Sequence, residues 1–173
     1  MPAQDAQATL ATADVFGQGT ACLVWTSSLP VHARHPLRVV DLMAGAKPHL
    51  MTGYSNGSGA AVSVEYASST RFYLADRSAG RPWATRLAFP VHVVSRRITR
   101  DLVAGTSRTE RFSYHHGHYD TVEREFRGFA RVDRRDSESA EHFVPDGAEA
   151  AADPLDQAPV LTRTWYHTGA GPD

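Results

Sequence analysis

The chain has 173 residues, which is enough for one domain with a hydrophobic core. Its formal net charge is −1, so composition gives no overall attraction to nucleic acid or to an anionic membrane. A single cysteine, Cys22, excludes an internal disulfide framework and a cysteine-based zinc site, and we expect it to be buried. The sequence shows neither a signal peptide nor an apolar run approaching the roughly 18 residues of a membrane span.

The N-terminal part predicts turns and short strands. In residues 13–25 a Gly-x-Gly turn at Gly17 and Gly19 precedes an apolar segment, as at the end of a β-propeller repeat. We therefore assign residues 1–25 to the end of a preceding propeller-like region. Residues 26–133 are assigned to a separate β-sheet segment, whose first apolar run is residues 37–43.

Two hairpins are predicted within this segment. Residues 47–54 and 60–67 flank Ser-Asn-Gly-Ser-Gly, and Asn-Gly between apolar runs is a strong local hairpin signal. In the second run Val62, Val64 and Tyr66 alternate with polar residues, which is typical of a half-buried strand.

A second hairpin is predicted from residues 91–100 and 107–115, which are joined by Asp-Leu-Val-Ala-Gly-Thr. Between the two hairpins, residues 71–75 predict a short aromatic strand and residues 76–89 a loop. In that loop Pro82 and Trp83 suit a packed corner.

The C-terminal third predicts one strand, a linker and another strand. Residues 122–131 form the strand, and Gly128 within it indicates a bulge or a close backbone approach. Residues 134–158 hold seven acidic residues and two arginines, which predicts a flexible linker. Residues 159–173 contain a further strand at 160–167, which implies a partner sheet that receives it.

These elements define an all-β protein. No window of 12 residues has a clean helical pattern of apolar positions. We predict a twisted, mostly antiparallel, multi-stranded sheet with long loops and little helix.

One motif suggests metal chemistry. His116, His118 and Asp120 have the spacing with which one loop can reach a pair of zinc ions. The histidine that would complete H-x-H-x-D-H is replaced by Thr121, and few further ligands follow. We therefore assign no catalytic, cofactor-binding or metal residue, and keep a small metal-dependent hydrolase as an alternative.

Arginine is unusually dense in the middle of the chain. Residues 71–111 contain nine arginines and three acidic residues, with aromatic residues between them. Such a mixture could bind single-stranded nucleic acid. We expect instead that the arginines form inter-strand ion pairs or coat one face of the sheet, with their stems on aromatic rings.

Several ordered blocks resemble the middle region of the B component of insecticidal bacterial toxin complexes, which is shared with SpvB-type virulence proteins. The blocks are Leu-Val-Trp (23–25), Thr-Arg-Phe-Tyr-Leu (70–74), Gly-Arg-Pro-Trp-Ala-Thr-Arg-Leu (80–87), Phe-Pro-Val-His-Val-Val (89–94), Tyr-His-His-Gly (114–117), Glu-Arg-Glu-Phe-Arg-Gly-Phe (123–129) and Leu-Thr-Arg-Thr-Trp-Tyr-His (161–167). The resemblance runs from about residue 13 to residue 170. In this family the B component carries a propeller that docks on a pore-forming A component, and the remainder joins an Rhs-like C component in a β-shell around a toxic effector.

The resemblance implies a non-enzymatic segment of that shell, without a cofactor. Its partners would be the rest of the B component and the C component, with the A component contacted indirectly. No nucleic-acid binding and no membrane insertion are expected. The protein would be cytoplasmic in the producing cell and then extracellular, without a classical signal peptide. We expect this chain to be an internal piece of a larger protein or the product of a broken gene, and keep a stand-alone β-rich binding module as a further alternative.

Overall fold

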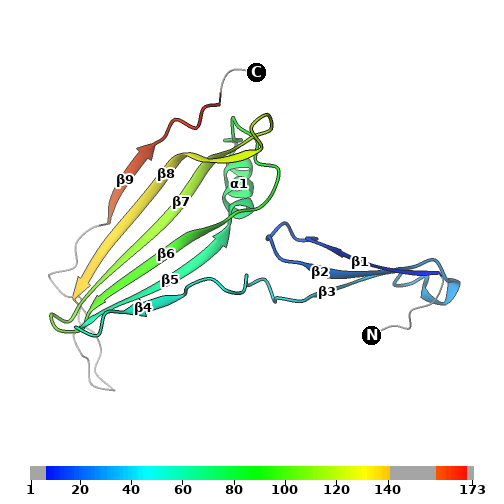
Figure 1. The fold of residues 1–173 in the computed structure, drawn as a ribbon, viewed down its shortest axis with the longest axis horizontal. Helices are drawn as coiled ribbons and strands as arrows, with labels where there is room; N and C mark the ends of the chain where they lie inside the picture. Colours follow the sequence, from blue (N-terminus) through cyan, green and yellow to red (C-terminus); the bar gives the residue numbers. More distant parts are fainter. Residues whose placement is uncertain (1–6, 141–158, 171–173) are drawn as a thin grey trace.

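A computed structural model describes residues 7–140 and 159–170 and shows an almost entirely β architecture (Figure 1). The described residues form two antiparallel sheets, with strand orders β1-β2-β3 and β4-β5-β6-β7-β8-β9. The three-stranded sheet extends to one side of the larger sheet as a narrow arm, and the helix α1 packs near one end of the larger sheet. The prediction of an all-β, mostly antiparallel fold is confirmed.

The small sheet contains β1 (Ala8–Ala13), β2 (Cys22–Ser27) and β3 (Leu37–Asp41). Cys22 and Trp25 are buried on the central strand, so the expected burial of the cysteine is confirmed. The structure differs from the predicted boundary after residue 25, because this position lies inside β2. That strand pairs with β1 and with β3, so both sides of the boundary belong to one sheet.

Both predicted hairpins are present in the large sheet. The first joins β4 (Gly53–Ser55) to β5 (Ala60–Ser68), and the Asn56 side chain accepts hydrogen bonds from two backbone amides of the turn. The second joins β6 (His92–Asp101) to β7 (Thr106–Asp120). In its turn the Asp101 side chain accepts hydrogen bonds from two backbone amides.

The prediction of a strand at 71–75 and a loop from residue 76 is wrong in its first part, because α1 (Ser69–Ser78) occupies these residues. Ser68 caps the helix by accepting a hydrogen bond from the Thr70 amide. Phe72 and Asp76, one helical turn apart, both contact β7. The side of α1 that faces the sheet thus includes a carboxylate. The sequence therefore lacks the regular spacing of apolar residues from which a helix is predicted.

The strand β8 (Glu125–Ala140) continues past the predicted start of the linker at residue 134. Charges that suggested a solvated linker are inter-strand partners instead, since Asp136 pairs with Arg108 and Arg134 lies 3.6 Å from Glu110. The predicted bulge at Gly128 is confirmed, because the β7–β8 register shifts beside it. The rest of the predicted linker, 141–158, lies outside the described residues.

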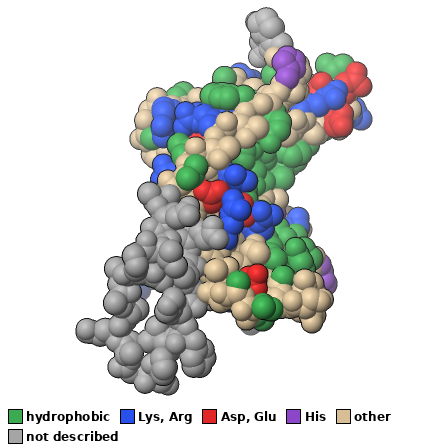
Figure 2. Space-filling model, turned by 90° about the vertical axis from the view of Figure 1, so that its left-hand side faces the viewer, with side chains coloured by type: hydrophobic (Ala, Val, Ile, Leu, Met, Phe, Trp, Pro, Cys, Tyr) green, Lys and Arg blue, Asp and Glu red, His purple; other side chains and the backbone are tan. Residues whose placement is uncertain are grey.

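The last strand, β9 (Val160–Trp165), pairs with β8 at the edge of the large sheet. This agrees with the prediction that the strand after the acidic segment joins a sheet formed by earlier strands. All six of its residues are exposed, and Trp165 keeps 63% of its surface accessible. Hydrophobic side chains reach the surface at several places on this side of the molecule (Figure 2).

The described residues bury few apolar side chains. Among them only Cys22, Trp25, Val62 and Phe129 are buried hydrophobic residues, while twenty large hydrophobic residues are exposed. Soluble monomers rarely leave extended apolar surface uncovered. The described part of the chain therefore leaves more large apolar side chains exposed than it buries.

Candidate functional site

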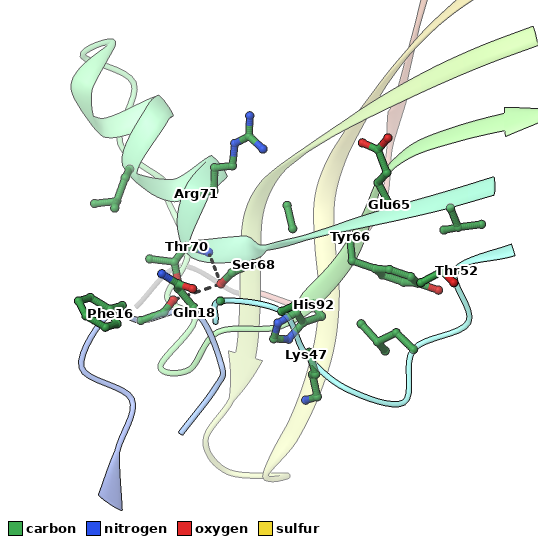
Figure 3. A pocket seen from close by; sticks show the side chains of 17 residues that line it. Phe16, Gln18, Lys47, Thr52, Glu65, Tyr66, Ser68, Thr70, Arg71 and His92 are labelled. Atoms are coloured by element: carbon green, nitrogen blue, oxygen red, sulfur yellow. Dashed lines mark hydrogen bonds between the residues drawn. The ribbon is translucent and has the colours of Figure 1, made fainter. Parts of the chain in front are cut away.

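A groove of about 650 Å³ lies where the arm meets the large sheet (Figure 3). Its lining comes from the β1–β2 turn, the segment before β4, the end of β5, the first turns of α1 and the start of β6. The side chains that give it its chemical character are Phe16, Gln18, Lys47, Glu65, Arg71 and His92.

One hydroxyl group joins the parts of this groove. Ser68 Oγ accepts the hydrogen bond from the Thr70 amide and donates to the Gly17 carbonyl at 3.2 Å. Gly19 lies so close to His92 that a Cβ at this position would come within 2.6 Å of the imidazole. The sequence therefore needs glycine here, both for its φ of +77° and for this close approach.

The side chains that line the groove include the imidazole of His92 and the hydroxyl group of Ser68. Burial lowers the pKa of His92, the positive charge of Lys47 adds to this effect and Asp14 opposes it, so the site favours the neutral imidazole. The Ser68 hydroxyl is occupied by the helix cap and by Gly17. Within the described residues the groove thus combines apolar walls with exposed cationic side chains.

A second polar cluster fixes α1 to the sheet. Asp76 Oδ2 accepts a hydrogen bond from Trp83 Nε1 at 2.8 Å and lies 2.5 Å from His115 Nδ1. Asp76 and His115 are only 5% and 8% exposed. Trp83 also packs edge-on against Tyr73 and Phe129, which confirms the predicted packed corner.

The other nitrogen of His115 faces a second carboxylate. Its Nε2 lies 3.8 Å from Asp133, which is also paired with Arg131 and Arg163. Burial opposes ionisation of Asp133, but the hydrogen bond from Arg163 and the charges of both arginines hold its pKa below the usual value. The imidazole lies between two carboxylates rather than beside a nucleophile. The arrangement therefore connects α1, through Asp76, to β7 and β8.

Two of the three residues of the metal alternative make structural hydrogen bonds. His116 has a φ of 58°, and its Nδ1 accepts a hydrogen bond from the Ala84 amide at 3.1 Å. Asp120 accepts hydrogen bonds from the Val122 and Glu123 amides. His118 Nδ1 is buried without a hydrogen-bond partner. Across residues 7–140 and 159–170, no three His, Cys, Asp or Glu side chains are grouped to hold a metal ion.

Sequence reasoning missed the most buried charged residue. Glu110 is 1% exposed, accepts a hydrogen bond from Arg97 Nε at 2.6 Å and lies near Arg134. The expectation that arginines pair between strands is confirmed by these contacts. Arg131 lies over the Trp165 ring at 5.4 Å, so stacking of arginine on aromatic rings is confirmed as well.

Within the part of the chain that is described, no helix has both the length and the apolarity to cross a membrane. An antiparallel sheet that exposes many apolar side chains and buries a charged group such as Glu110 between arginines is typical of a structural part of a larger assembly.

Comparison with known proteins supports this class and identifies the family. Residues 1–169 match the family described as "Insecticide toxin TcdB middle/N-terminal region", and the chain belongs to this family. The resemblance to toxin-complex B components is thereby confirmed. No curated protein matches.

Solved toxin-complex structures share the fold. A Photorhabdus luminescens Tc holotoxin pore with mutated TccC3 is 31% identical, with a TM-score of 0.74 over 96% of this chain. A TcdB2-TccC3-Cdc42 crystal structure is 30% identical, with the same TM-score and coverage. This chain spans only 7% of the length of each of those chains.

Proposed function

We propose that this chain is a non-catalytic structural segment of a toxin-complex B component and forms part of the β-shell that encloses a toxic effector. The observation that carries the proposal is the alignment of 96% of the chain, at a TM-score of 0.74, with structures that contain TcdB2 and TccC3. An Rhs-like C component and the rest of the B component are the direct partners, and a pore-forming A component is contacted indirectly.

The surface of the described residues supports this role. β9 is exposed along its whole length, and the sheet buries few apolar side chains. A sheet edge of this kind pairs readily with further strands. In the proposed shell, neighbouring polypeptide covers this edge and the apolar faces. We further propose that residues 1–25 adjoin a propeller and that the protein acts outside the producing cell.

The test is a chimera in which residues 1–169 replace the matching region of TcdB2. The chimera is co-expressed with TccC3, and protection of the enclosed C-terminal region of TccC3 from trypsin is measured. We expect a stable complex with protection equal to that of the parent pair. A chimera that folds but leaves this region open to trypsin would contradict the shell role.

The isolated chain offers a second measurement. A stand-alone binding module should melt cooperatively as a monomer, whereas a shell segment with open edges should aggregate or melt broadly. A sharp, reversible, monomeric transition would favour the binding-module alternative.

A further inference from the structure

The two faces of the large sheet carry different charge arrangements. On one face Arg97, Glu110 and Asp136 are cross-strand neighbours on β6, β7 and β8. The two acidic residues, Glu110 and Asp136, are paired there with arginines, because Arg97, Arg108 and Arg134 lie around them. Each of these arginines therefore has a carboxylate partner within the sheet.

The opposite face carries three arginines side by side. Arg96, Arg111 and Arg135 are direct partners in the β6–β7 and β7–β8 registers, and we call them the arginine row. Glu65 of β5 is next to the row at one end, and Leu161 of β9 is next to it at the other. Neighbouring strands lie about 4.8 Å apart, so the like charges repel one another.

The acidic residues near the arginine row do not neutralise it. Glu65 accepts a hydrogen bond from Arg96 at 3.0 Å and so balances one of the three charges. Asp133, two residues from Arg135 on the same strand, is already paired with Arg131 and Arg163. Arg111 and Arg135 are exposed and form no ion pair with any residue in the described ranges.

We propose that the arginine row is a docking surface for an acidic polypeptide segment of a partner chain. Guanidinium groups bind carboxylates through paired, charge-assisted hydrogen bonds, and a partner carboxylate would remove the repulsion within the row. The exposed Leu161 at the end of the row offers an apolar contact beside the charges. This inference rests on the proposed function only in assuming that a partner chain lies against this sheet.

Nucleic acid fits the arginine row less well. Binding of single strands combines cationic groups with aromatic rings on which bases stack. The positions next to the row on its own face include Ile98, Thr109, Ser113, Asp133 and Ser137, and none of these is aromatic. Trp165, on the same face, is exposed but lies four residues along β9 from Leu161, away from the row, and Arg131 lies over its ring.

The test measures binding of a fluorescent 20-residue poly-L-glutamate to the 173-residue chain by anisotropy. The double variant Arg111→Gln/Arg135→Gln is compared with Arg34→Gln/Arg77→Gln, which removes the same charge from exposed positions elsewhere. We expect binding at low salt that weakens at least tenfold in the row variant and less than threefold in the control. Equal losses in both variants, or no binding by the unaltered chain, would overturn the proposal.

Two further measurements separate other occupants. Tighter binding of a 20-nucleotide oligo(dT) than of poly-L-glutamate, lost in the row variant, would assign the row to nucleic acid and overturn the proposal. Binding of poly-L-glutamate only after the five acidic residues of 141–158 are neutralised would assign the row to the chain's own acidic segment and would also overturn the proposal.

The row variant is also placed in the TcdB2 chimera. If poly-L-glutamate fails to bind but trypsin protection persists, only this inference is wrong and the proposed shell role stands.

Discussion

Replacing Asp76 with alanine should loosen α1 from the large sheet. The Asp76 carboxylate accepts from Trp83 Nε1 and contacts His115 Nδ1, and both carboxylate and imidazole are buried. Its removal leaves two buried donors without a partner, at a cost of about 1–3 kcal/mol each. Arg81, 3.9 Å from Asp76 and largely exposed, contributes little. We expect a total loss of about 3 kcal/mol.

Hydrogen–deuterium exchange of the α1 amides measures this loss directly. A change of about 3 kcal/mol in the local opening equilibrium corresponds to exchange that is roughly 150-fold faster. Asp101→Ala is the matched control, because it removes a carboxylate from an exposed turn at the far end of β6. The control should loosen its own turn and leave the α1 amides protected.

Asp76→Asn separates the charge from the shape of the side chain. The amide keeps an acceptor for Trp83 but loses the negative charge opposite His115. We expect an exchange rate between those of the unaltered chain and the alanine variant. If α1 exchanges at the same rate in Asp76→Ala as in the unaltered chain, other contacts such as that between Phe72 and Tyr114 hold the helix, and the reasoning about the polar cluster is wrong.

Three further changes test other parts of the structure by urea unfolding. Ser68→Ala should cost about 1 kcal/mol, because α1 loses its N-terminal cap. Gly117→Ala should cost about 1–3 kcal/mol and shift tryptophan emission, because the new Cβ would lie 2.8 Å from the Trp83 ring. Burial lowers the pKa of His116 from 6.5, so the unfolded chain binds more protons below about pH 6.5 and stability falls as the pH falls. His116→Asn should therefore reduce the loss of stability between pH 7 and pH 5.

Each of these changes has a control or a contradicting result. An unaltered unfolding midpoint in Ser68→Ala would show that the cap is dispensable. Gly57→Ala, where a Cβ meets no atom within 4 Å, carries only the cost of its positive φ and should leave tryptophan emission unchanged. An equally steep loss of stability in His116→Asn would assign the acid sensitivity to another group.

The hairpins could be predicted from the sequence because their signals are local. Asn56 and Gly57 specify the β4–β5 turn, and Asp101 and Gly105 specify the β6–β7 turn, without help from distant residues. Alternation of apolar and polar residues then indicates which face of β5 is buried.

The helix and the polar clusters could not be predicted in this way, because distant partners decide them. The aromatic residues at the start of α1 favour a strand by propensity, but the cap and the contact of Asp76 with His115 favour a helix. The burial of Glu110 depends on arginines from two neighbouring strands. Neither partner set is marked by a spacing in the sequence.

The strands of the large sheet lie in the order in which they occur in the chain. Each described strand after β4 therefore finds the edge of its predecessor already formed when it leaves the ribosome, and no strand must be inserted between two others. Most contacts on such a path join neighbouring strands, which keeps the entropy of chain closure low at the short turns. The sheet can thus grow at a single edge during synthesis, and among the described strands β9 is the one that carries this growing edge.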